Sequence, residues 1–137
     1  MSISWTTLQR ASRGDSAAMD QMRRSPEVEE KYMKRKNDLE ERGLDISDFI
    51  HKRLFADAPH RWAFTTNQFP YDTKADHWLL WKNRDLDPND YTEEMELHEE
   101  ICKHIKVPFI LLDRSTRHRT VPGVRHYHIF TQKAHVD

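Results

Sequence analysis

Two histidines, His126 and His128, are separated by one residue in an otherwise apolar stretch close to the end of the sequence. Their alternation with Tyr127 and Ile129 is typical of a β-strand, in which successive side chains point to opposite faces. The two imidazoles are therefore expected on one face of a sheet. Imidazole serves as nucleophile, general acid or base, or metal ligand, and the spacing alone does not choose among these roles.

An arginine-rich segment, residues 113–120, precedes this strand. Guanidinium groups are planar, permanently charged donors that match the oxygens of phosphate and carboxylate. We therefore expect an anion to be held against the two histidines. The alternative is a solvated hairpin with surface arginines, and histidines that face solvent or stack on tryptophan. The residues expected to bind the substrate are Arg114, Ser115, Arg117, Arg119, Arg125, Asn67 and Trp78.

A third histidine, His77, begins another stretch with strand character, His77–Trp81. If the two strands are neighbours, His77 completes a possible three-histidine zinc site with His126 and His128, in which one position stays open for water. In the phosphate reading no cofactor is expected. A glycine-rich phosphate loop is excluded, because the chain has only three glycines.

Composition restricts the classes of protein to consider. The 137 residues suit one domain, and 22 basic against 23 acidic residues give no general attraction to nucleic acid or membrane. The single cysteine, Cys102, excludes a disulfide scaffold and favours a reducing compartment. With no signal peptide or membrane-length apolar run, we expect a cytoplasmic protein without a membrane partner. Nothing in the sequence specifies a protein partner.

The region 1–56 predicts helices. Ser4, Asp15, Ser25 and Asp45 are each placed to cap a helix, and Pro26 suits the first turn of the third. The fourth helix should have an apolar face, and the basic run 34–36 of the third should be solvated. The apolar residues at helical spacing are Ile46, Phe49, Ile50 and Leu54.

The region 57–137 predicts a sheet with one helix. Strands are expected at 61–65, 77–81, 108–112 and 124–131, and a helix capped by Thr92 should run to about Lys106 with Leu97, Ile101 and Ile105 inward. The order of elements predicts a single α+β domain in which the N-terminal helices pack on a mostly antiparallel sheet.

Nearly the whole chain resembles a small family known best from fungi, the N-acetylglucosamine-induced proteins, whose activity is unsettled. The matching features are Trp5 near a helical region and the stretch from Asn67 to Asp72 that contains Phe69-Pro70-Tyr71. They continue with His77–Trp81, then a strand, a basic loop, and Val121-x-x-Val124-x-His126-Tyr127-His128.

The second half also resembles the histidine-triad (HIT) nucleotide hydrolases and transferases, which implies a HIT-like core over 57–137. By this resemblance His128 takes the central, nucleophilic place and His126 the first. Phe130 stands where the family has its third histidine, the group that assists the leaving group. Phenylalanine donates no hydrogen bond, so His77 or Arg114 would have to substitute, or the fold serves binding alone.

Three functions compete at this point. The first is a hydrolase or transferase acting on a nucleotide, nucleotide sugar or sugar phosphate through His128, His126 and His77. The second is a non-catalytic module that binds a phosphorylated metabolite or nucleic acid. The third is a metal-dependent hydrolase with His77, His126 and His128 as ligands. The sequence favours the first slightly.

Overall fold

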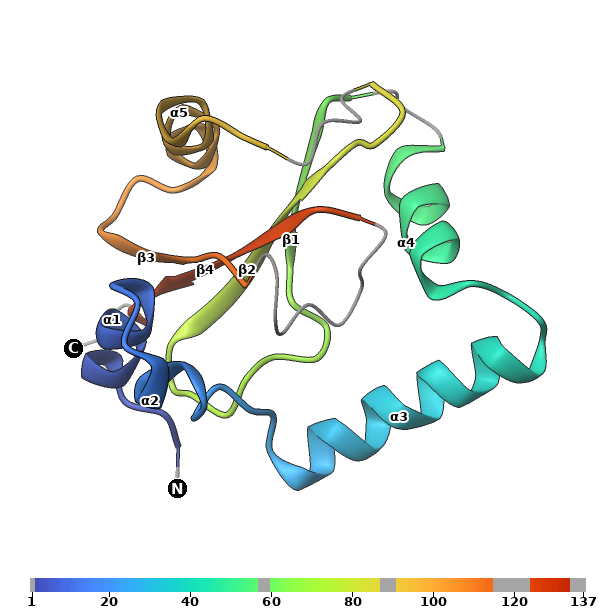
Figure 1. Cartoon of the computed structure of the whole chain (residues 1–137), viewed down its shortest axis with the longest axis horizontal. Helices are drawn as coiled ribbons and strands as arrows, with labels where there is room; N and C mark the ends of the chain where they lie inside the picture. The colour runs from blue at the N-terminus through green and yellow to red at the C-terminus, as the bar shows by residue number, and fades with distance from the viewer. Residues whose placement is uncertain (1, 57–59, 87–90, 115–123, 134–137) are drawn as a thin grey trace.

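The computed structural model describes residues 2–56, 60–86, 91–114 and 124–133. Within these ranges the chain forms four strands in one antiparallel sheet of order β1-β2-β4-β3 (Figure 1). The strands are β1 (Trp62–Thr66), β2 (Asp76–Lys82), β3 (Phe109–Leu112) and β4 (His126–Thr131). The predicted α+β fold is confirmed, and the strand that carries the two histidines is central in the sheet.

One face of the sheet is covered by α5 (Glu94–His104). Leu97, Ile101 and Ile105 pack there against Leu80 and Ile129, and all five side chains are buried. The inward-facing residues predicted for this helix are therefore confirmed. Its predicted cap is wrong: Glu93 occupies the N-cap position without a side-chain bond, and Thr92 instead lies 3.2 Å from Nζ of Lys82.

The opposite face is covered at one end by α1 (Trp5–Ser12) and α2 (Ser16–Met19). Leu8, Ala11 and Ala18 pack there against Ile110 and Phe130. Side-chain oxygens of Ser4 and Asp15 accept backbone N–H groups in the first turns of these helices, as predicted. This packing covers the part of the face that is formed by β3 and by the C-terminal end of β4.

The remaining part of this face lies opposite α3 (Pro26–Glu41) and α4 (Ile46–Phe55). Figure 1 shows the two helices as an arm that runs below the sheet and then turns up beside it. Ser25 and Asp45 cap them as predicted, through bonds of 3.3 and 3.0 Å to the N–H groups of Val28 and Asp48. Only Tyr32 and Leu39 are buried in the sixteen residues of α3, so this helix makes few core contacts.

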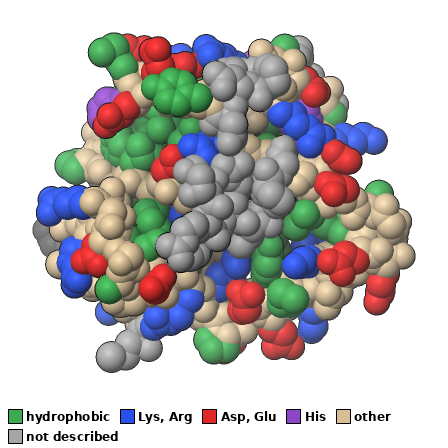
Figure 2. Space-filling model, viewed as in Figure 1, with side chains coloured by type: hydrophobic (Ala, Val, Ile, Leu, Met, Phe, Trp, Pro, Cys, Tyr) green, Lys and Arg blue, Asp and Glu red, His purple; other side chains and the backbone are tan. Residues whose placement is uncertain are grey.

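The outer surface mixes charges of both signs. Figure 2 shows acidic and basic side chains interspersed over the visible face, with no continuous patch of either colour. No helix within the described ranges is long and apolar enough to cross a membrane.

Candidate functional site

A cavity of about 410 Å³ lies between the α3–α4 arm and the sheet face that carries the histidines. Because strand residues alternate, His126, His128 and Phe130 of β4 share this face with their partners on β2, which are Trp81, Leu79 and His77. His126 and His128 line the cavity, whereas Phe130 is fully buried beside it. The predicted placement of the two imidazoles on one face is consistent with this register. The volume falls in the range of small-molecule sites, about 300–1,000 Å³.

His77 and His128 are joined in a chain of hydrogen bonds whose first donor is a backbone amide. The N–H of Tyr71 donates to Nδ1 of His77 at 3.1 Å, so that nitrogen carries a lone pair. In neutral His77 the proton is therefore on Nε2, which donates to Nδ1 of His128 at 2.8 Å. It follows that neutral His128 carries its proton on Nε2. His128 thus presents an N–H donor, not a lone pair.

His126 has the other tautomer. Its Nδ1 lies 3.0 Å from the backbone carbonyl oxygen of Val124, which only accepts, so Nδ1 carries the proton and Nε2 the lone pair. The ring stacks on Trp81 with centroids 4.5 Å apart, and lies 5.4 Å from the ring of His128. The cavity is therefore lined by two imidazoles of opposite hydrogen-bonding character.

Burial keeps His77 and His128 neutral. Desolvation, assisted by the charge of Arg24, lowers the pKa of His77 to about 3. Desolvation also lowers the pKa of His128 well below its ordinary 6.5, and the positive charges of Arg114 and Arg24 act in the same direction. A cation formed at either ring would be enclosed by apolar groups and would face other positive charge.

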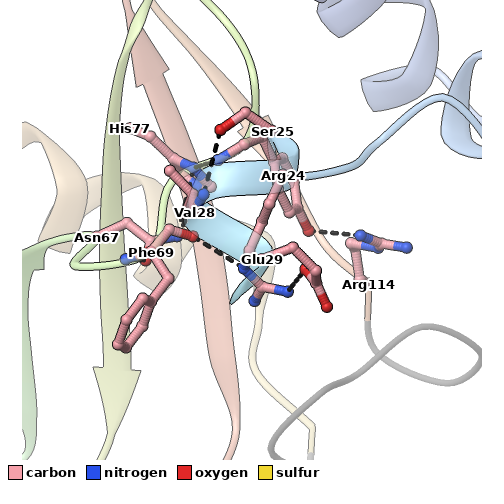
Figure 3. Close-up of polar contacts among 9 residues, drawn as sticks. Arg24, Ser25, Val28, Glu29, Asn67, Phe69, His77 and Arg114 are labelled. Carbon is pink, nitrogen blue, oxygen red and sulfur yellow. Dashed lines mark hydrogen bonds and ion pairs between the residues drawn. The ribbon is translucent and has the colours of Figure 1, made fainter. Parts of the chain in front are cut away.

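The charged side chains that line the cavity are all cationic: Arg24, Arg35 and Arg53, with no aspartate or glutamate in the described lining. Arg24 precedes α3 and is held from three sides, as Figure 3 shows in part. Its Nε donates to the carbonyl of Phe69 at 3.0 Å, its NH1 lies 3.2 Å from Glu29, and its guanidinium lies 4.0 Å from the ring centroid of Tyr32. The cavity therefore has a positive interior beneath a surface of mixed charge.

Arg35 contributes the second cation from the middle of α3. Its guanidinium carbon lies 5.6 Å from the ring centroid of Phe49 and 5.8 Å from that of Phe69. Among the described residues no carboxylate lies within ion-pair distance of it. In the basic run 34–36, which was predicted to be solvated, Lys34 is exposed, whereas Arg35 is half-buried and lines the cavity.

Arg114 contacts Tyr71 and is not part of the described cavity lining. Its NH1 donates to the Tyr71 hydroxyl, and Tyr71 stacks on His128 with centroids 5.1 Å apart. Within the described part of the chain, Nε of Arg114 is buried and has no hydrogen-bond partner. Arg114 therefore acts on the histidines through Tyr71 and through its charge.

The structure brings together some of the residues predicted from the sequence and separates others. Asn67 lines the cavity, and its amide nitrogen lies 3.3 Å from Nδ1 of His77. Trp78 and Arg125 are on the α5 face, where Trp78 donates to Thr131 and Arg125 pairs with Asp113 at 2.7 Å. Ser115, Arg117 and Arg119 lie outside the described residues.

The three histidines do not form a ligand set for zinc in this arrangement. The facing nitrogens of His77 and His128 share one proton at 2.8 Å, and the second nitrogen of His77 accepts from Tyr71, so His77 has no nitrogen to turn toward a common metal. Among the described residues, no three histidine, cysteine, aspartate or glutamate side chains are grouped to hold a metal ion.

Sequence reasoning missed Arg24, Arg35 and Arg53 as cavity residues. Each lies in a stretch rich in charged side chains, which is the ordinary composition of a solvated helix. One signal was present: the fourth helix has four apolar residues on one face, and they line the cavity while remaining only half-buried. An apolar face without enough apolar cover is a sign of a binding surface.

No protein-family model and no curated protein matches the sequence. Among solved structures, the chain is similar to one described as the crystal structure of HTC1. The TM-score is 0.67 at 15% identity, and the match covers 96% of this chain and 85% of that one. At this level of identity the likeness concerns the fold alone. The resemblances to the N-acetylglucosamine-induced and histidine-triad families stay predictions.

Proposed function

We propose that this chain binds a small phosphorylated metabolite in the α3–α4 cavity and cleaves or transfers its phosphoryl group. The observation that carries this proposal is the pair of opposite tautomers, a lone pair on His126 and an N–H on His128, in a cavity whose charged lining residues, among those described, are all arginines. One imidazole is suited to attack phosphorus, and the other is suited to hold an oxygen on it.

The reacting nitrogen in this proposal is Nε2 of His126, not His128 as the histidine-triad resemblance implies. The lone pair on Nε2 of His126 forms the N–P bond while the P–O bond to the leaving group breaks, and the leaving oxygen takes a proton from water. The carbonyl of Val124 accepts from Nδ1–H and stabilises the positive charge that the ring then carries. A water molecule subsequently releases the phosphate and restores neutral His126.

His128 assists as a neutral donor. Because its pKa is far below the usual range, it stays uncharged at neutral pH and offers one N–H to a phosphoryl oxygen. Arg24 and Arg35 supply the charge that offsets the phosphoryl oxygens, which is usually the dominant contribution to phosphoryl transfer.

A non-catalytic binding module is the second candidate, and one observation favours it. Phe130 fills the place at which a third histidine would assist the leaving group, and its ring is fully buried against His77 with centroids 4.4 Å apart. The described lining of the cavity contains no carboxyl group to act as a general acid in its place. On this reading the arginines and histidines bind the phosphorylated ligand without turning it over.

The test is a turnover assay with a panel of alkyl and aryl phosphates, nucleotides, nucleotide sugars and sugar phosphates, in which release of phosphate is measured. We expect His126→Asn to lower turnover by at least about 100-fold, which is the lower range for loss of a catalytic imidazole. Binding of the same ligand should persist, and acid-labile phosphate should be trapped on the wild type but not on His126→Asn.

The matched control is His60→Asn, because His60 is exposed and does not line the cavity. Full turnover in His126→Asn would refute the proposed role of His126. Saturable binding without any product, weakened by Arg35→Ala, would establish the binding module instead. A panel that neither binds nor reacts would overturn both candidates.

A further inference from the structure

We propose that the phosphorylated ligand of this cavity carries an apolar body, an alkyl or aryl group without hydroxyls, and that this body packs against α4. The inference rests on the function proposed above, because it takes the anionic group of the ligand to lie at the histidines. It adds the chemical class of the remainder of the molecule.

The wall of the cavity formed by α4 carries four apolar side chains beside Arg53. Ile46, Ile50 and Leu54 of α4 pack partly against a buried cluster that contains Leu79 and Trp81 of the sheet. These three α4 residues and Phe49 line the cavity and are only half-buried. The protein thus leaves unfilled apolar surface on α4, and an apolar ligand group would remove that surface from water.

This apolar wall is next to the reacting histidine. His126 stacks on Trp81, and Trp81 belongs to the same cluster as Ile50. A phosphoryl group placed at Nε2 of His126 therefore has its ester substituent within reach of α4. The geometry does not require a long ligand to join the two subsites.

Two polar side chains of the lining are already engaged, whereas Thr66 and Gln68 are exposed. The hydroxyl of Thr65 accepts from Nε1 of Trp81 at 3.2 Å. Asn67 is already engaged, because its carbonyl oxygen accepts from the N–H of Phe69 at 2.9 Å and its amide is directed at His77. The described lining has no carboxylate, the group that most strongly accepts from a hydroxyl. Burying several ligand hydroxyls against Ile46, Phe49 and Ile50 would leave them without partners, which is costly.

The test is a series of methyl, propyl and hexyl phosphate, with glucose 6-phosphate, AMP and inorganic phosphate as comparators. Affinity is measured by calorimetry on the wild-type chain. Burial of each further methylene is expected to tighten binding by about fourfold until the wall is covered. Ile50→Ala should weaken hexyl phosphate by about five- to tenfold and leave inorganic phosphate unchanged. The control, Leu44→Ala, alters an exposed residue between α3 and α4 and should change neither affinity.

The outcomes separate this inference from the function it rests on. Equal affinity along the series, or tighter binding of glucose 6-phosphate or AMP than of hexyl phosphate, overturns the apolar body while the phosphate site stands. Failure of inorganic phosphate and of every ester to bind overturns the proposed function and the inference with it. The wild-type series alone decides this, so it does not depend on the variant being folded.

Discussion

Acidification is expected to destabilise this protein through His77 and His128, and the change His77→Gln should weaken that dependence. Below about pH 6.5 an unfolded histidine takes up a proton, whereas folded His77 stays neutral down to a pKa of about 3. Unfolding therefore takes up protons throughout this window, so the free energy of unfolding falls as the pH falls. The contribution is fully present above pH 6.5 and is lost on the way down to about pH 3.

The size of the effect follows from the linkage. One proton taken up on unfolding lowers the free energy of unfolding by roughly 1.4 kcal/mol per pH unit. His77 alone would then account for a loss on the order of 4–5 kcal/mol across the whole interval. Neutral folded His128 has the same sign, so the slope from both imidazoles approaches about two protons. Because small domains are stable by about 5–15 kcal/mol, this slope is large enough to govern acid unfolding.

The assay is urea denaturation between pH 5 and pH 7.5, where most carboxylates stay ionised. We expect the slope of unfolding free energy against pH to fall by about one proton in His77→Gln, roughly 1.4 kcal/mol per pH unit. Glutamine keeps a donor and an acceptor near the two nitrogens of the ring. The matched variant His60→Asn removes an exposed histidine and should leave the slope unchanged.

The comparison of slopes, not of stabilities at one pH, decides the matter, because His77→Gln also loses ring packing against Phe130. Equal slopes for the wild type and His77→Gln would refute the assignment of a neutral buried His77. So would a wild-type protein that gains stability between pH 7 and pH 5.

Two further predictions concern the same face of the sheet and the face behind it. Phe130→His, which places a third histidine in β4, should lower the unfolding free energy by about 2 kcal/mol or more, because a polar ring would replace a fully buried apolar one. Unchanged urea stability would contradict this. Arg35→Ala should weaken phosphate binding at least severalfold in calorimetry and make the affinity less dependent on salt. Arg125→Ala should leave the affinity unchanged, since Arg125 pairs with Asp113 on the α5 face. Equal losses in these two variants would refute the location of the anion site.

The sequence predicted the elements well because the signals that begin and end them are local. Ser25 and Pro26 start α3, and the alternation of His126, Tyr127 and His128 marks a strand, whatever the rest of the chain does. The shared face of the two histidines follows directly from the two-residue period of a strand. These inferences needed no knowledge of which element packs on which.

The cavity could not be predicted in this way, because it depends on contacts between distant segments. Arg24 reads as one more charge before a helix, but the carbonyl of Phe69, 45 residues later, holds it at the cavity. Arg125 adjoins His126 in the sequence and yet points to the other face, which the alternation itself implies once the strand is known. The tautomers depend on the N–H of Tyr71 and the carbonyl of Val124. Because these are backbone groups, the pattern of side-chain types in the sequence does not predict their hydrogen bonds to the rings.

The strand order β1-β2-β4-β3 has a consequence for synthesis on the ribosome. β1 and β2 form a hairpin early, but β3 emerges before β4 and has no strand partner until β4 pairs with both β2 and β3. The sheet is therefore completed by the same segment that brings in His126 and His128. Until it arrives, apolar edges of β2 and β3 are exposed, and pairings of this kind between distant segments form slowly. We therefore expect a nascent chain that is halted before β4 to bind chaperones.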